Sequence, residues 1–201
     1  MVAKSPALRS FQHRNFRILY PANALSNIGT WAQRVAQDWL VLQLTNNDPT
    51  NLGLVTAIQF LPAMLLSTYG GLLADRFSKR KLLFITNLGA GLASLVLGLL
   101  VMANSVQLWH VYALALLVGI FSAIDSPIRI SFTSELVGKD DLANAVSLNS
   151  ANFNAGRLIG PALSGYLIAS FGTGPSFVLN TLTYGVMVVT LLFIRDQDLH
   201  I

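Results

Sequence analysis

Residues 82–102 have the sequence LLFITNLGAGLASLVLGLLVM, a run of 21 residues without a charged side chain. About 20 such residues in a helix cross a hydrocarbon core roughly 30 Å thick, and a helix satisfies its own backbone polar groups within lipid. Five comparable stretches lie before and after it, at Arg17–Leu44, Leu52–Leu73, Leu108–Ser126, Ala143–Phe171 and Phe177–Ile194. Together with Leu82–Met102 they predict an all-α integral membrane protein with six transmembrane helices.

The composition agrees with a membrane protein and excludes several other classes. Of the 201 residues, 53% are hydrophobic and 11% are charged, whereas a soluble domain carries charge on about 25% of its residues. The absence of cysteine excludes a disulfide scaffold and thiolate chemistry. His13, His110 and His200 lack the spacing of a metal site. Since the chain also has no Ser-His-Asp set and no phosphate loop, we expect no enzyme activity, no metal and no cofactor.

The basic residues predict how the chain is oriented in the membrane. Loops on one side hold eleven of the 13 Lys and Arg residues, and the opposite loops at 46–51, 103–107 and 172–176 hold none. The positive-inside rule therefore places both termini in the cytoplasm. The net charge of +4 is accordingly a topology signal, and we expect no nucleic acid partner. The eleven are Lys4, Arg9, Arg14, Arg17, Arg76, Lys79, Arg80, Lys81, Arg129, Lys139 and Arg195.

The loops are short, so no segment forms a separate soluble domain. We expect a cytoplasmic lead at 1–16, a six-helix bundle at 17–194 and a cytoplasmic tail at 195–201 that begins a central loop. Asp125-Ser126-Pro127 is expected to end the fourth helix, and Arg129–Asp141 to lie along the cytoplasmic surface. Two groups of three helices enter the membrane from opposite sides, which predicts a 3+3 inverted repeat.

The first predicted helix carries a polar stripe with Gln37 beside it. Spacings of 4, 3, 4 and 4 residues place five polar side chains on one face, namely Asn23, Asn27, Thr30, Arg34 and Asp38. Arg34 and Asp38 are one turn apart and are predicted to pair, which lowers the free energy cost of two charges in the membrane. Two interpretations follow. Either the residues form a structural pair or a helix end close to the headgroups, or the stripe lines a cavity in which Asp38 takes up and releases a proton.

A second informative segment is GGLLADRFSKRK at 70–81. The small residues before its acid, Asp75, allow close helix packing, and the basic run after that acid fixes the orientation of the chain in the membrane. The segment resembles motif A of the major facilitator superfamily, with Ser78 where that family usually has glycine. The matching positions are Gly71, Leu73, Ala74, Asp75, Arg76, Lys79 and Arg80.

The resemblance implies a cytoplasmic latch that holds the outward-facing state. In that family the acid of motif A docks on the C-terminal half, and a basic residue pairs with an acid at the cytoplasmic end of the fourth helix. Asp125 is placed for that role, so we expect it to pair with Lys79, with Arg80 as the competing base. Pairing of Asp125 with Arg129 one turn later is the local alternative.

The fifth predicted helix contains GRLIGPALSG at 156–165. Two glycines clear one face for close contact, and the proline bends the helix; Asn149 and Asn152 continue nearly the same face. This pattern is either a packing seam with a kink or a functional motif, and it resembles motif C of facilitator antiporters. The residues that carry it are Gly156, Gly160, Pro161 and Gly165. Arg157, inside the predicted span, faces an anionic substrate or a carboxylate such as Asp38, or it is structural.

These motifs identify the chain as resembling the N-terminal six-helix half of a major facilitator exporter. The stretches 31–39 and 149–165 are most similar to the branch that contains the enterobactin exporter and macrolide efflux proteins. The resemblance implies proton-driven export of an amphipathic small molecule, a drug or a siderophore, across a bacterial inner membrane by alternating access. Asp38 is then the first candidate for proton coupling.

That reading also defines the expected partners. They are membrane lipid, a small-molecule substrate, the proton, and a C-terminal half or a second copy of the chain. Two alternatives stay open: a half-size transporter that works as a homodimer, and a non-transporting membrane protein that serves as an assembly or regulatory partner. A fragment of a longer transporter is the preferred interpretation, because an isolated half would expose its polar face.

Overall fold

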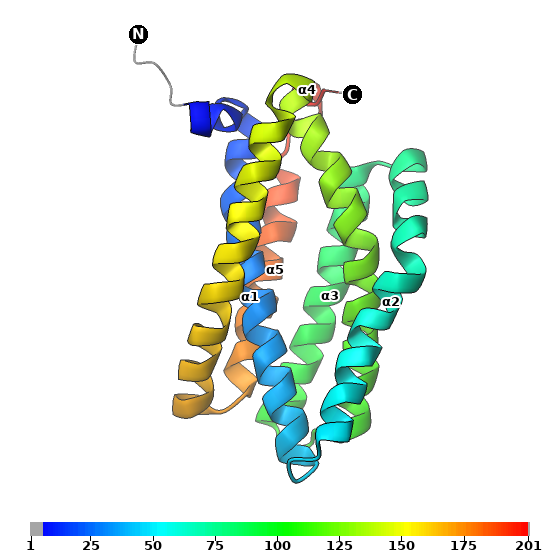
Figure 1. Cartoon of the computed structure of the whole chain (residues 1–201), viewed down its shortest axis with the longest axis vertical. Coiled ribbons are helices and arrows are strands. Elements are labelled where there is room, and N and C mark those ends of the chain that lie inside the picture. The colour runs from blue at the N-terminus through cyan, green and yellow to red at the C-terminus, as the bar shows by residue number, and fades with distance from the viewer. Residues whose placement is uncertain (1–5, 201) are drawn as a thin grey trace.

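The computed structural model describes residues 6–200, which form a bundle of long helices (Figure 1). Lys4 and the rest of 1–5, expected in the cytoplasmic lead, lie outside the described residues, as does Ile201. The described part is helical and contains no strand. Its elements are η1 (Pro6–Gln12), α1 (Arg14–Leu44), α2 (Pro49–Arg76), α3 (Lys79–Met102), α4 (Leu108–Phe171), α5 (Gly174–Leu192) and η2 (Asp196–Asp198).

The 64 residues of α4 fold back on themselves at Gly138, and the two arms run in opposite directions (Figure 1). Gly138 has φ +71° and ψ 177°, a backbone conformation that only glycine adopts readily. The first arm, 108–137, and the second arm, 139–171, contain the two stretches that the sequence marked as separate helices. The turn at Gly138 thus replaces the expected surface loop.

Two expectations for this region are wrong. Asp125-Ser126-Pro127 does not end a helix, since the first arm continues to Gly138, and most of 129–141 is helical instead of lying along the surface. Pro127 is tolerated because its ring lies against Gly70 of α2, where a Cβ would come within 2.6 Å of Pro127 Cγ. Neighbouring helices commonly accommodate a proline in a membrane helix in this way.

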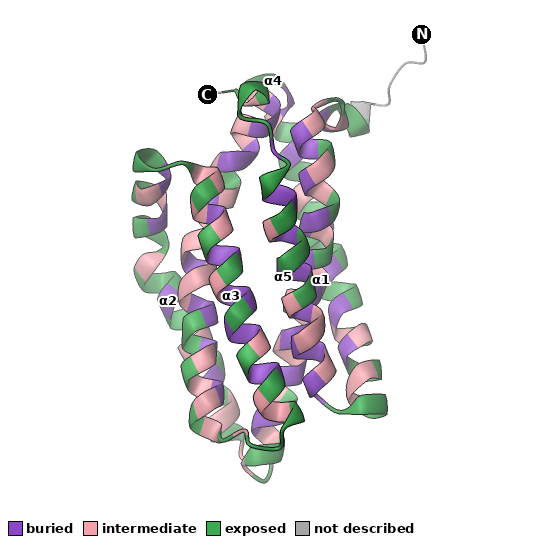
Figure 2. Cartoon of the chain, turned by 180° about the vertical axis from the view of Figure 1, so that it is seen from behind, coloured by how far each residue is buried: buried purple, intermediate pink, exposed green. Residues whose placement is uncertain are grey.

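Four of the described helices are long and apolar enough to cross a membrane, namely α2, α3, α4 and α5. α1 has 31 residues but falls outside this group, since its polar stripe interrupts the apolar sequence. On the back of the bundle, exposed residues alternate with buried ones along α3 and α5 (Figure 2). Many of the exposed ones are apolar, such as Ile85, Leu92 and Leu182, as suits a surface that faces lipid. The 3+3 repeat of six spans stays a prediction.

Apolar clusters occupy both ends of the bundle, with a polar layer between them. The first cluster, around Phe16, Phe132 and Leu191, lies at the end that holds both chain ends. The second cluster, around Leu40, Leu97 and Phe177, lies at the other end. Most of the basic residues gather at the first end, but Arg129 does not belong with them: it lies within α4, so its predicted position in a cytoplasmic loop is wrong.

Two glycines of α4 allow α1 and the second arm of α4 to come into backbone contact. A Cβ on Gly156 would lie 2.8 Å from the Cβ of Asn27, and one on Gly160 would lie 2.6 Å from the Cβ of Trp31 and 2.8 Å from the carbonyl oxygen of Ile28. Gly165, by contrast, has nothing within 4 Å of its Cβ position. The seam therefore depends on Gly156 and Gly160 and not on Gly165.

Gly160→Ala should destabilise the protein, because the added methyl group meets backbone that cannot move aside. We expect the free energy of unfolding to fall by about 1–3 kcal/mol, as is typical of overpacking. Thermal unfolding of the native protein in detergent measures this. The matched variant Gly165→Ala should be neutral or slightly stabilising, since alanine is favoured over glycine in helices. Equal melting temperatures for the two variants would contradict the seam.

The start of the chain is fastened to the second arm of α4 through one buried carboxylate. Asp141 forms an ion pair with Arg9 Nε at 3.1 Å, lies 2.9 Å from His13 Nε2, and accepts a hydrogen bond from Gln12 Nε2 at 2.8 Å. Ser10 donates to the backbone carbonyl of Asp141. The hydrogen bonds from His13 and Gln12, with the charge of Arg9, hold the pKa of Asp141 below its usual range.

Acidification should release η1. Because the pKa of Asp141 is lower in the folded protein than in the unfolded chain, this attachment is fully present above the unfolded value of about 3.9 and is lost as pH falls through the lower folded pKa. At neutral pH, Asp141→Asn should mimic the release and speed amide hydrogen exchange in 10–14. Asp140→Asn, which changes the exposed neighbour, is the control and should leave that exchange unchanged.

Candidate functional site

The polar layer between the two apolar clusters opens into a cavity of about 830 Å³. Side chains from all five helices, including both arms of α4, line it. Most of its polar lining consists of amides and hydroxyls, and its charged residues among those described are Arg34, Asp125 and Arg129. A cavity of this size and lining suits a small organic molecule.

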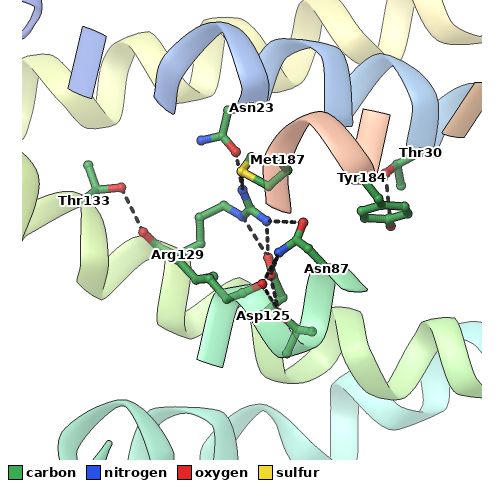
Figure 3. Close-up of polar contacts among 10 residues, drawn as sticks. Asn23, Thr30, Asn87, Asp125, Arg129, Thr133, Tyr184 and Met187 are labelled. Carbon is green, nitrogen blue, oxygen red and sulfur yellow. Dashed lines mark hydrogen bonds and ion pairs between the residues drawn. The ribbon is translucent and has the colours of Figure 1, made fainter. Parts of the chain in front are cut away.

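An ion pair between Asp125 and Arg129 forms the centre of the polar layer (Figure 3). The two residues are one turn apart on the first arm of α4, with Arg129 Nη2 2.6 Å and Nε 2.8 Å from Asp125 Oδ2. From α3, Thr86 Oγ1 and Asn87 Nδ2 each donate to Asp125 Oδ1 at 2.7 Å. The carboxylate is therefore bonded on both oxygens, which offsets the cost of removing it from water.

Arg129 extends this network to the other helices. It donates to Asn23 Oδ1 of α1 and, at 3.3 Å, to Asn87 Oδ1 of α3, and Met187 of α5 lies beside it (Figure 3). Its backbone carbonyl accepts from Thr133, whose hydroxyl accepts from Asn149 Nδ2 of the second arm at 3.3 Å. Four helices thus meet at one guanidinium group.

Arg34 occupies a different part of the cavity and has aromatic neighbours instead of an acid. Its guanidinium carbon lies 4.6 Å from the ring centroid of Trp31 and 5.0 Å from that of Phe60. Its Nε is buried without a hydrogen-bond partner among the described residues. The guanidinium of Arg157 lies 5.6 Å from the same Trp31 ring, and Phe153 meets that ring edge-on at 5.8 Å.

Four of the five residues of the polar stripe line the cavity. Asn23, Asn27, Thr30 and Arg34 line the cavity, and so does Asn149, whereas Asp38, Gln37, Asn152 and Arg157 are not among its described lining residues. Gln37 is buried and donates to Gln59 at 3.4 Å, and Asn152 is buried and donates to the carbonyl of Tyr20 at 3.4 Å. Arg157 is exposed.

The predicted Arg34–Asp38 ion pair is wrong. Between these two described residues there is no contact of charged atoms within 4.0 Å, although the two charges still act on each other electrostatically. The reason is that the guanidinium of Arg34 lies over the rings of Trp31 and Phe60. Cation–π contact of this kind contributes about 0.5–2 kcal/mol.

The predicted Lys79–Asp125 pair is also wrong. Lys79 instead pairs with Glu135 at 2.6 Å, because the first arm of α4 continues as a helix and brings Glu135 to the start of α3. Asp125 takes the local alternative, Arg129. Arg80 pairs with Asp196 at 2.8 Å and donates to the carbonyls of Leu191 and Leu192, where it caps the end of α5.

The remaining motif A residues lie at the end of α2. Gly71 has nothing within 4 Å of its Cβ position, whereas its neighbour Gly70 is buried against Ile124 and Pro127. Asp75 and Arg76 are exposed and form no ion pair with a described residue. Two glycines of motif C, Gly156 and Gly160, form the α1 seam described above. Pro161 lies within α4, and Gly165 is exposed.

Sequence reasoning missed Arg129, Thr86 and Asn87 as cavity residues, and it missed Glu135 as the partner of Lys79. Arg129 was assigned to a loop because Pro127 was taken to end the helix. A signal was nonetheless present: Asp125 and Arg129 have the spacing of an intrahelical pair, and Thr86 and Asn87 are adjacent polar residues in an otherwise apolar run. Among the described residues no group of three or more His, Cys, Asp or Glu side chains is placed to hold a metal ion.

Comparison with known proteins adds a family to this geometry. Residues 5–199 match the family described as transmembrane secretion effector. The staphyloferrin A transporter of Staphylococcus aureus (strain NCTC 8325 / PS 47) is 29% identical over 177 residues, which cover 88% of this chain and 44% of that protein. The enterobactin exporter EntS of Shigella flexneri is 25% identical over 167 residues, 83% of this chain and 40% of that protein.

A third relative, the multidrug resistance protein MdtG of Enterobacter lignolyticus (strain SCF1), is 28% identical over 159 residues, 78% of this chain and 37% of that protein. The chain thus spans less than half the length of these curated relatives. The family match runs through nearly all of the described residues, including motif A, motif C and the cavity lining. The chain therefore belongs to the transmembrane secretion effector family of major facilitator transporters.

Proposed function

We propose that the chain is the N-terminal half of a secondary active transporter that exports an amphipathic small molecule from the bacterial cytoplasm by alternating access. The observation that carries this proposal is the 830 Å³ cavity, to which every long helix of the bundle contributes side chains. Relatives named as a siderophore transporter, a siderophore exporter and a multidrug resistance protein support an exported drug or siderophore. A cavity of this kind near the middle of the membrane is typical of secondary transporters.

Two features support a second half. The relatives are more than twice as long as the part that this chain matches, and Asp75 and Arg76 of motif A are exposed at the end of α2 without an ion-pair partner among the described residues. In the family the acid of this motif docks on the C-terminal half. A second copy of this chain would need to present the same docking site, which makes the homodimer less favoured.

The intact mass of the native protein, extracted from the membrane of its source cell, tests this arrangement. We expect about twice the 21.7 kDa of this chain, because the matched relatives are built on that scale. A native mass near 21.7 kDa would instead establish a half-size protein, and cross-linking in the membrane would then decide between a homodimer and a partner of another transporter.

The packing of the helices supports the inverted repeat. α1 packs on the second arm of α4 at Gly156 and Gly160, α2 packs on the first arm at Gly70, and α3 packs on α5 at Gly91. A twofold operation that exchanges α1, α2 and α3 with the first arm, the second arm and α5 returns the same set of pairs. This is the relation expected of a 3+3 inverted repeat, with both chain ends at the basic, cytoplasmic end.

Asp125, which lines the cavity, and Asp38, which does not, suit different roles. Asp125 is held by Arg129, Thr86 and Asn87, so protonating it would break several charge-assisted contacts. Asp38 has no hydrogen bond or ion pair with a described residue, and Arg34 lies one turn away on the same helix. We therefore retain Asp38 as the group that takes up the coupling proton, with Asp125 holding the helices together.

Asp38→Asn should abolish export driven by a pH gradient, because an amide cannot take up and release the proton. The measurement is uptake of two permanently charged probes, 1-naphthalenesulfonate and trimethyl(1-naphthylmethyl)ammonium, into energised everted vesicles that contain the complete native protein. Vesicles without the protein give the background. The amount of protein in the membrane and its melting temperature should stay those of the unchanged protein.

Asp125→Asn is the contrasting variant. It leaves Arg129 without its acid, so we expect a loss of stability of up to about 3 kcal/mol, the low end for a broken buried pair since both side chains are partly exposed. Full pH-driven uptake by Asp38→Asn would remove Asp38 from the mechanism. Absence of any pH-driven uptake by the unchanged protein would favour the non-transporting assembly or regulatory partner.

A further inference from the structure

We propose that the cavity selects amphipathic anions, and that Arg34 binds the anionic oxygens of the transported molecule while aromatic side chains hold its apolar body. This inference rests on the proposed transport function and names the substrate class. It is drawn from the charge balance of the cavity, the geometry of Arg34 and the neighbouring rings.

The cavity has one cation more than its acids neutralise. Of the charged residues that line it in the described part of the chain, Arg129 is paired with Asp125. Arg34 is left without an acid within 4.0 Å. The nearest acid on its own helix, Asp38, lies outside the described lining. A positive charge in a partly dry cavity attracts an anion and repels a cation, an effect that is strengthened by low dielectric.

Arg34 also has a hydrogen-bond donor without an acceptor among the described residues. Trp31 and Phe60 are stacked against its guanidinium, and neither ring can accept an in-plane hydrogen bond. Its Nε is buried without a partner among the described residues, and such a donor carries a desolvation penalty. A guanidinium presents a rigid fork of donors that matches carboxylate, sulfonate or phosphate oxygens. A bound anion would supply the missing acceptors.

The surroundings of Arg34 are suited to an apolar body attached to that anion. Phe60 and Phe153 both line the cavity and are both exposed, at 46% and 47%. Trp31 meets Phe153 edge-on and lies against Gly160, where α1 and the second arm of α4 meet. Arg157 above the Trp31 ring adds a second cation near the same place. A molecule that joins an anionic group to an aromatic or aliphatic body fits this arrangement.

Equilibrium binding to the complete native protein in detergent tests the proposal. The probes are 1-naphthalenesulfonate and trimethyl(1-naphthylmethyl)ammonium, which share a ring system and differ in charge. We expect the unchanged protein to bind the sulfonate at least tenfold more tightly. Arg34→Gln should raise the sulfonate Kd about tenfold, which corresponds to about 1.4 kcal/mol, and should leave the ammonium Kd unchanged or lower it.

One further variant separates the effect of the charge from that of the planar guanidinium, and another serves as a control. Arg34→Lys keeps the charge without the planar fork, so the sulfonate Kd should rise by less, about threefold. Arg17→Gln removes an exposed arginine of the same helix outside the cavity lining and should change neither Kd. If Arg34→Gln does not give a folded protein, the Arg34→Lys result decides alone. The proposal is overturned by equal affinity for the two probes, by an unchanged sulfonate Kd, or by equal loss of both probes.

Binding and transport fail independently, so the two proposals are separable. Selective sulfonate binding without uptake into vesicles would reject the transport function and leave the anion site. Uptake of both probes at equal rates with equal affinities would retain transport and reject the anion preference.

Discussion

Close approach of helix backbones is the constraint on which the bundle depends. Lipid tails are as apolar as leucine, so the hydrophobic effect does not press membrane helices together, and van der Waals contact between closely fitted surfaces must do so. In this chain that contact occurs where a side chain is missing: Gly156 and Gly160 against α1, Gly70 against the first arm of α4, and Gly91 against α5. The same contacts set the position of Trp31, and through it the position of Arg34. Helix packing and cavity chemistry are therefore one property of the sequence.

The layering of the bundle follows from a second physical requirement. A polar group in a membrane protein must be paired or must face a hydrated space. The chain meets this requirement by gathering polar side chains of α1, α3 and both arms of α4 around the cavity and by placing apolar clusters at both ends of the bundle. Asp125 and Arg129 satisfy each other and their neighbours within the layer. Arg34 does not, and this difference separates a residue that holds the bundle from one that is available to a ligand.

Most of the fold was predictable from sequence, because the apolar lengths and the basic turns are read from the chain directly. The observed helices overlap every predicted stretch, and Asn27, Arg34 and Asn149 are among the residues that line the cavity. The failures around the first arm of α4 have a common cause. Pro127 was taken as a helix end, but Gly70 leaves room for its ring, so the helix continues and carries Arg129 inward and Glu135 to Lys79. Which residues pair across helices depends on contacts of this kind between helices, and residue spacing along one helix does not reveal them.

The location of the central ion pair on a single helix has a consequence for biosynthesis. A charged side chain costs roughly 2.5–3.5 kcal/mol when a helix enters the membrane from the translocon. This cost arises before other helices are present to supply partners for the charge. Asp125 and Arg129 are one turn apart, so they neutralise each other as soon as that turn of helix forms. The first arm of α4 thereby carries both charges into the bilayer as a nearly neutral segment. Thr86, Asn87 and Asn23 join the pair only when the bundle assembles, so insertion and assembly become separate steps.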